Sequence, residues 1–358
     1  MAAIAVVAAA TGCTGQSGNA GPAPRRSVAA PPPLVITQAE AEKVFSRFEW
    51  ERRTPSGWKA ADAVAKVVTG PLMAEWHAHA AVRAVAKRPE PVVAGLVNPA
   101  FAIPAERDQP SYPRSFVVFS KANGREDGPA TAVHYFVQQT AGAEWQAAVE
   151  TWVATTAAVP LDTENVWYAP TAVQIRKTPI ATISRDGTGT AVLSPTADAD
   201  RAACGRFADY MSFTTPDAKP KNEQFAPGPL SDEMLRKLGE KPKHPGLNGL
   251  VNYTFEHAVS GLQLPVLKLD NGASLVACPL VRAEQMKGED STVSFNFSGD
   301  SDRTALLDAE GKWWRRVDAK LSLTALIELP PSSAPGPAEV AACNCFDPQL
   351  LEVTGKPR

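Results

Sequence analysis

The fold is decided by the stretch Val317-Asp318-Ala319-Lys320-Leu321-Ser322-Leu323-Thr324-Ala325-Leu326-Ile327-Glu328-Leu329, which follows the adjacent residues Trp313 and Trp314. Apolar and polar residues alternate along most of it, and this period of two is typical of a β-strand that buries one face. Neighbouring side chains on a strand point to opposite sides, so at least one of the two tryptophans leaves the core side of its sheet. We expect that tryptophan to line a pocket, or an interface between domains or with a partner, and we favour the contact between domains.

Two hairpin signals lie upstream of this stretch. Phe116–Phe119 leads toward Asn123-Gly124, and Val266–Leu269 leads into Asp270-Asn271-Gly272. Asn-Gly between apolar runs favours a tight turn because both residues tolerate positive φ. Further strands are predicted at Ala132–Gln138, Trp145–Val153, Ser274–Val281 and Val293–Phe297. Additional strands, which complete the first sheet or bridge the two halves of the chain, are predicted at Val166–Tyr168, Ile180–Ile183 and Ala191–Leu193.

Helices are predicted before each group of strands. Thr37-Gln38-Ala39-Glu40 has the form of a capping box and opens an amphipathic helix. In the second half, Cys204, Phe207 and Met211 recur at helical spacing. A Gly-Pro break precedes another helix in each half, at residues 70–71 and 228–229. The order of helix, helix and antiparallel meander therefore occurs twice.

This order resembles the NTF2-like, cystatin-type α+β fold, and the whole chain is similar to uncharacterised lipoproteins of actinobacterial envelopes. The resemblance implies an α+β chain with two tandem cone-shaped domains, each with N-terminal helices packed on a curved antiparallel sheet. The first domain would cover residues 35–195 and the second, stabilised by disulfides, residues 196–358. A single mixed α+β domain, or a second half with a different fold, remains the alternative.

The N-terminus resembles a bacterial lipoprotein signal. An apolar run at residues 2–10 leads into Thr11-Gly12-Cys13, although no Lys or Arg precedes Arg25. The resemblance implies a signal peptide at residues 1–13, lipidation of Cys13, and attachment to the extracytoplasmic face of the cell membrane by a diacylglyceryl group. Residues 14–34 are rich in Gly, Ser and Pro and are predicted to be a disordered tether. The alternatives are an Ala-rich N-terminus with an incidental cysteine, and a membrane-spanning helix, for which about 20 apolar residues are needed.

The other cysteines are Cys204, Cys278, Cys343 and Cys345, an even number that favours two disulfides outside the cytoplasm. A bond between Cys343 and Cys345 would close a very small ring, with side chains poorly placed for disulfide geometry. We therefore expect Cys204 and Cys278 each to pair with one cysteine of the C-terminal segment. A four-thiolate metal site is the alternative, but the spacing lacks the Cys-x-x-Cys pairs typical of zinc.

The net charge and the absence of known motifs exclude several classes of function but identify none. The formal charge is −2 over 358 residues, with both signs interspersed, which gives no footprint for nucleic acid or for polybasic recognition of a membrane. No nucleophile elbow, phosphate loop, metal motif or cofactor motif occurs, so no catalytic, metal or cofactor residue is predicted. His134, next to Tyr135 on a predicted strand, is the candidate for a pocket, where it could act as an acid or base. The alternative is a histidine packed within or on the strand.

The leading hypothesis is a lipid-anchored, non-enzymatic envelope protein that binds a small ligand or another envelope protein. One alternative is an enzyme of hydratase, isomerase or hydrolase type that uses one cone as its active site. Another is a structural spacer of the envelope. An enzyme needs a concave pocket with converging polar groups, whereas a binding protein can present filled cores and an exposed patch.

Overall fold

The computed structural model describes residues 32–54, 61–87, 93, 95–123, 130–154, 182–212, 224–227, 250–296, 301–307, 312–345 and 348–358. The described residues, all of which lie within Pro32–Arg358, form one compact unit of α+β structure. The predicted signal peptide, Cys13 and most of the tether therefore lie outside the described residues. No helix in the described ranges has both the length and the apolar character needed to cross a membrane.

Sheet 1 and its helices come from the first half of the chain. Its strands form an antiparallel meander in the order β1 (Leu96–Ala102), β2 (Arg114–Ala122), β3 (Ala130–Gln138) and β4 (Trp145–Ala154). A short 3-10 helix, Glu106–Asp108, joins β1 to β2. The helices are α1 (Gln38–Arg53), α2 (Ala61–Val67) and α3 (Gly70–Ala86). The predicted capping box is confirmed at the start of α1, where Glu40 N donates to Thr37 Oγ1 at 3.2 Å and Thr37 N donates to Glu40 Oε2 at 3.1 Å.

Sheet 2 comes from the second half of the chain. Its elements in chain order are α4 (Ala197–Met211), β5 (Val251–Val259), β6 (Leu267–Lys268), β7 (Ser274–Gly288), α6 (Ser301–Leu306), β8 (Trp314–Leu329), β9 (Glu339–Cys343) and β10 (Gln349–Pro357). The strand order is β10-β8-β7-β5, with β6 beside β7 and β9 beside β8. The long strands β7 and β8 pair with each other. β7 also pairs with β6 near its start and with β5 near its end, and β8 also pairs with β10 near its start and with β9 near its end.

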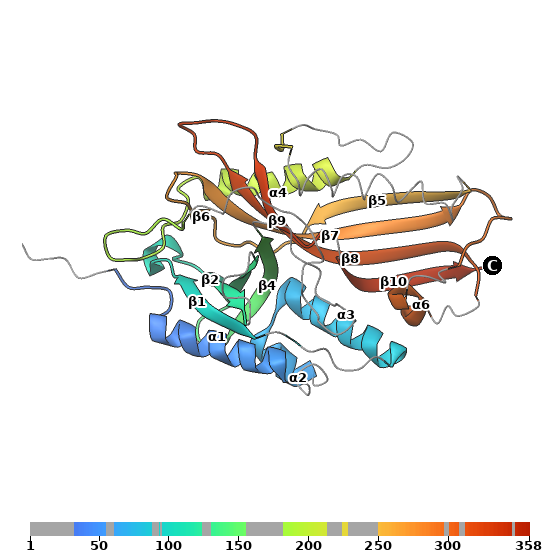
Figure 1. Ribbon diagram of the computed structural model, residues 1–358, viewed down its shortest axis with the longest axis horizontal. Coiled ribbons are helices and arrows are strands. Elements are labelled where there is room, and N and C mark those ends of the chain that lie inside the picture. Colours follow the sequence, from blue (N-terminus) through green and yellow to red (C-terminus); the bar gives the residue numbers. More distant parts are fainter. Residues whose placement is uncertain are drawn as a thin grey trace, which may run out of the picture. The chain divides into compact units, whose positions relative to one another are not determined.

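The two sheets pack against each other between layers of helices (Figure 1). Phe45 and Phe48 of α1 pack on one face of sheet 1, with Phe136. Tyr135 lies on the other face of sheet 1, in a core that also contains Leu326 of sheet 2. The face of sheet 2 that packs on sheet 1 is called here the inner face. The outer face packs on α4 in a core that contains Phe207, Met211 and Leu323.

The predicted division into domains at residues 195 and 196 does not separate two independent cores. The core between the sheets draws residues from both halves, and residues 32–358 form one compact unit. The segment 182–194 joins the halves, since Ala191 bridges Pro104 after β1 and Leu193 bridges Leu267 of β6. Ala191–Leu193 is therefore not the predicted strand, but its isolated bridges connect the two halves, which is one of the two roles predicted for it; Val166–Tyr168 lies outside the described residues.

The predicted strands are partly confirmed. The turn before β7 forms as expected, with Gly272 at φ +85° and its N–H donated to Leu269 O at 2.9 Å. Of the predicted strand Val293–Phe297, residues 293–296 are described, and within them only Phe295 makes a bridge, to Trp314. Four strands, β1, β5, β9 and β10, were not predicted. Gly124 and the helix predicted after residue 228 lie outside the described residues.

The disulfide pairing differs from the prediction. Cys204 of α4 bonds to Cys278 of β7, with their Cα atoms 5.2 Å apart, and Cys343 bonds to Cys345. Helix α4 packs directly on β7, which brings the first pair together. The second pair meets because the chain bends after β9, where Asn344 N donates to Thr324 O at 3.2 Å, and the two Cα atoms lie 5.0 Å apart. Among the described residues no group of three or more possible ligands could hold a metal ion, which gives the alternative of a four-thiolate site no support.

Candidate functional site

The candidate site lies where the inner face of sheet 2 extends beyond sheet 1. On β7, Leu275 and Ala277 are buried in the core between the sheets. Farther along the same face of the same strand, Ala283 and Lys287 are exposed and Gln285 is partly exposed. Alternate residues of a strand share a face, so these positions continue one surface. We call this uncovered part of the inner face the open face.

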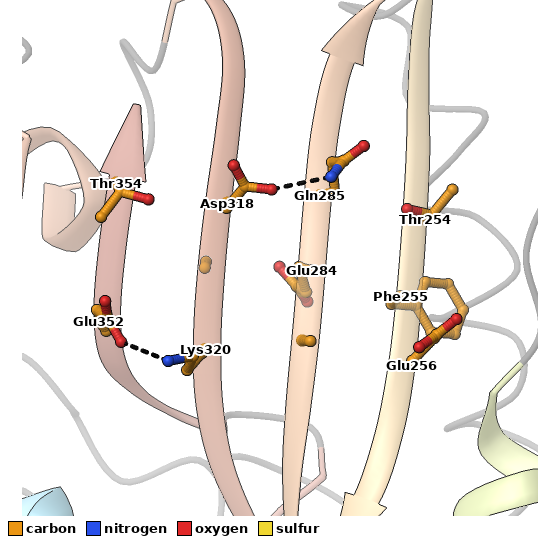
Figure 2. A pocket seen from close by; sticks show the side chains of 11 residues that line it. Thr254, Phe255, Glu256, Glu284, Gln285, Asp318, Lys320, Glu352 and Thr354 are labelled. Carbon is orange, nitrogen blue, oxygen red and sulfur yellow. Dashed lines mark hydrogen bonds and ion pairs between the residues drawn. The ribbon is translucent and has the colours of Figure 1, made fainter. Parts of the chain in front are cut away.

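The open face contains a pocket of about 310 Å³ (Figure 2). Its lining residues come from four of the six strands of sheet 2, namely β5, β7, β8 and β10: Thr254, Phe255, Glu256, Ala283, Glu284, Gln285, Asp318, Ala319, Lys320, Glu352 and Thr354. The strand register arranges the inner-face members of this set in two rows that cross the sheet. One row is Thr254, Gln285, Asp318 and Thr354, and the other is Glu256, Ala283, Lys320 and Glu352.

Hydrogen bonds and ion pairs between neighbouring strands fix most of these side chains. Gln285 Nε2 donates to Asp318 Oδ1 at 2.9 Å, and Lys320 Nζ lies 2.8 Å from Glu352 Oε2 (Figure 2). Arg316 donates to both carboxylate oxygens of Asp318, at 2.7 and 2.9 Å. These bonds to Arg316, together with the one from Gln285, lower the pKa of Asp318, because they favour its charged form.

Glu256 differs from the other carboxylates of the pocket. Across the register its neighbour is Ala283, whose methyl group separates Glu256 from Lys320. In the part of the chain that the structure describes, no hydrogen bond or ion pair engages Glu256. Of the three carboxylates in the inner-face lining, Asp318 is paired with Arg316 and Glu352 with Lys320, which leaves Glu256 without a cation among its described neighbours. This arrangement favours a positively charged group.

A buried ion cluster supports the strands from the outer face. Glu284 lies in direct register with Phe255 and Ala319, and its carboxylate accepts from Arg282 Nη2 at 2.7 Å and from Arg303 of α6. Arg282 and Glu284 are both buried. Because a buried charge is tolerated only when paired, these contacts hold β7 and α6 in fixed positions beneath the pocket.

The sequence candidate His134 is placed in the core under α1 and does not line the pocket. Its ring packs edge-on against Phe48, with ring centroids 5.1 Å apart, and its Nε2 lies 3.2 Å from Glu150 Oε2. Burial acts to raise the pKa of Glu150, but the contact with His134 and the charge of Arg52 outweigh it, so the pKa is lowered. His134 is fully buried, and the packed-histidine alternative describes its position.

A third buried acid, Glu75, lies where the covered part of the inner face meets the open face. Glu75 of α3 accepts a hydrogen bond from Ser322 Oγ of β8 at 2.6 Å. Burial raises the pKa of Glu75 to about 7, although the bond from Ser322 opposes this shift. This contact fastens a helix of the first half to the inner face of sheet 2. It lies one row of side chains from Lys320.

The two adjacent tryptophans also lie outside the pocket. Trp314 is buried in an outer-face cluster with Phe295 and Val317, and its indole ring lies over Gly355. Trp313 directly precedes β8 and is 48% exposed. Neither tryptophan lines the contact between the sheets.

Sequence reasoning missed the residues of the pocket, but one signal for them exists. Asn252, Thr254 and Glu256 occupy alternate positions of β5, and every one is exposed. Asp318 and Lys320 alternate with apolar residues in the same way on β8. Two strands with a polar face predict a solvent-facing surface, whereas a pocket on that surface depends on how the strands are placed side by side.

The chain was compared with known protein families, curated proteins and solved structures. No family model, no curated protein and no solved structure matches the chain.

Proposed function

We propose that this chain is a lipid-anchored, extracytoplasmic binding protein that holds a small, positively charged polar ligand on the open face of sheet 2 without transforming it. The observation that carries the proposal is the pocket of about 310 Å³, whose inner-face side chains include three carboxylates and one ammonium. A volume of this size lies at the lower end for small-molecule sites. It suits a ligand about as large as one sugar or one amino acid.

Glu256 is the residue that would bind the charged group. Asp318 and Glu352 already accept from Arg316 and Lys320, so a ligand must compete for them. Glu256 has no such described partner, and it lies beside the small side chain of Ala283. Thr254 and Thr354 offer hydroxyl groups at the two ends of the neighbouring row. A ligand with one ammonium and several hydroxyl groups would match these groups.

The test uses three sugars of the same shape and different charge: glucosamine, glucose and glucuronate. Titration calorimetry at pH 7 should give the tightest binding for glucosamine and the weakest for glucuronate. Glu256→Gln should remove at least about 1 kcal/mol of the preference for glucosamine over glucose, because a hydrogen bond to a charged group contributes about 1.5 to 3 kcal/mol. Glu42→Gln, on the exposed face of α1, is the matched control and should change nothing. Equal binding of all three sugars, or none, would sink the proposal.

Two finer points belong to the same proposal. Each half, α1 to α3 with sheet 1 and α4 with sheet 2, would be an NTF2-like unit, with the two sheets stacked back to back. Attachment to the membrane would run through a diacylglyceryl group on Cys13. Cys13→Ser should then allow a high-salt wash to release the protein from the membrane fraction of its host, and retention after that wash would exclude this anchor.

A further inference from the structure

The end of sheet 2 where β8 begins carries a second surface, distinct from the pocket. Beyond the two rows of the pocket, the next row of the open face is Asn252, Lys287, Arg316 and Lys356, in direct register on β5, β7, β8 and β10. All four side chains are exposed. Three adjacent strands therefore present a cation at the same level of the sheet.

More cations and two apolar side chains extend this row. Lys312 and Arg315 are exposed on either side of the two tryptophans, and Arg358 N donates to Trp313 O at 3.0 Å. Trp313 is 48% exposed, and Leu250, directly before β5, is 51% exposed. We call these eight residues the basic edge: Leu250, Lys287, Lys312, Trp313, Arg315, Arg316, Lys356 and Arg358. Figure 1 shows the C-terminus at this end of sheet 2.

The charge of the basic edge is positive within the described ranges. Six cations lie there against three carboxylates, namely Asp318, which binds Arg316, and the residues Glu289 and Asp290 that follow β7. Lys287 and Lys356 take no part in any ion pair or hydrogen bond between described residues. Their charge is available to an external partner.

We propose that the basic edge docks on the anionic leaflet of a lipid bilayer. Tryptophan is enriched at the level of lipid headgroups, because its ring is apolar at one end and polar at the other. Lysine and arginine around it would bind the phosphate groups, and each contributes when it lies near an anionic surface. The combination of exposed Trp313 and Leu250 with cations fits this partner better than a soluble polyanion, which offers nothing for apolar side chains.

The test uses the full chain with Cys13→Ser, so that binding cannot come from an acyl group. Co-sedimentation should show binding to vesicles with 30% phosphatidylglycerol in phosphatidylcholine, weak binding to pure phosphatidylcholine, and loss of binding in high salt. Lys287→Gln with Lys356→Gln should weaken the partition coefficient about 30-fold. Trp313→Ala should weaken it several-fold.

Matched controls lie on α1, where Trp50 is 71% exposed and Lys43 is exposed. Trp50→Ala and Lys43→Gln should leave binding unchanged. The proposal is overturned by equal binding to both kinds of vesicle, or by equal losses in the control variants. It is also overturned if Trp313→Ala has no effect while soluble polyphosphate displaces the protein completely, since that pattern describes a general anion site. None of these outcomes depends on ligand binding in the pocket of the open face.

Discussion

The covered and open parts of the inner face of sheet 2 belong to the same strands but differ in chemistry. Where sheet 1 covers it, Leu275, Ala277 and Leu326 are almost completely buried. Where nothing in the described ranges covers it, Gln285 and Lys320 occupy the equivalent positions of β7 and β8. The comparison shows that a face of one strand is apolar where another sheet packs on it and polar where it meets solvent. The contact between Glu75 and Ser322 marks the change from one part to the other.

The largest expected difference between the two parts is in stability. Leu326→Ala should lower the free energy of unfolding by about 2 to 5 kcal/mol, because it leaves a cavity between the sheets. Lys320 lies on the same face of β8, six residues before Leu326 and on the open part. Lys320→Ala should lower the free energy of unfolding by less than about 1 kcal/mol, since an exposed ion pair contributes little. Urea denaturation followed by circular dichroism measures both. Similar losses for the two variants would mean that the open face is also packed.

A pH-dependent effect is expected at the border between the two parts. The pKa of Glu75 is about 7 in the folded protein against 4.5 for a free side chain. Between these values the unfolded chain releases the proton while the folded protein keeps it, so the free energy of unfolding falls as pH rises through this window. Above pH 7 the loss is complete and amounts to at most about 3 kcal/mol.

Glu75→Gln keeps a partner for Ser322 but carries no charge. Relative to the native chain, this variant should gain up to about 3 kcal/mol of stability at pH 8 and almost nothing at pH 4.5. Thr254→Ser on the open face, which removes no titratable group, serves as the control, and its difference should stay flat across the same range. A flat difference for Glu75→Gln as well would show that the Glu75 carboxyl is not held protonated by burial.

The smallest effect on stability is expected for Ala283→Leu in the floor of the pocket. Ala283 is exposed, so the larger side chain should change the free energy of unfolding by no more than about 0.5 kcal/mol. It would nevertheless fill the space between Glu256 and Lys320. Glucosamine binding, measured by calorimetry, should be lost while the urea midpoint stays the same. A variant that binds glucosamine normally would place the ligand elsewhere.

The sequence predicts the local elements of this fold better than their assembly. Period-two alternation locates β8, the capping box locates α1, and Asn271-Gly272 locates the turn before β7. These signals depend on neighbouring residues alone. The packing of sheet 1 on sheet 2 depends on residues such as Tyr135 and Leu326, which are far apart in the chain, and no local pattern reports that contact.

The same limit explains the errors at the cysteines and at the candidate site. The pairing of Cys204 with Cys278 depends on α4 lying over β7, which the spacing of cysteines does not report. His134 attracted interest as a titratable residue on a strand, but α1 covers it. The pocket residues were missed because each is an ordinary polar residue on an exposed strand face. Only the register, which places Glu256 beside Ala283 and Lys320, makes them a group.

The most direct test of the binding site is a map of amide chemical shifts during a glucosamine titration of isotope-labelled protein. We expect shifts at the amides of Glu256, Ala283 and Lys320, with none at Leu275 or Leu326 between the sheets. Shifts confined to another part of the molecule, or a spectrum that does not change at millimolar glucosamine, would contradict the assignment of ligand binding to the open face.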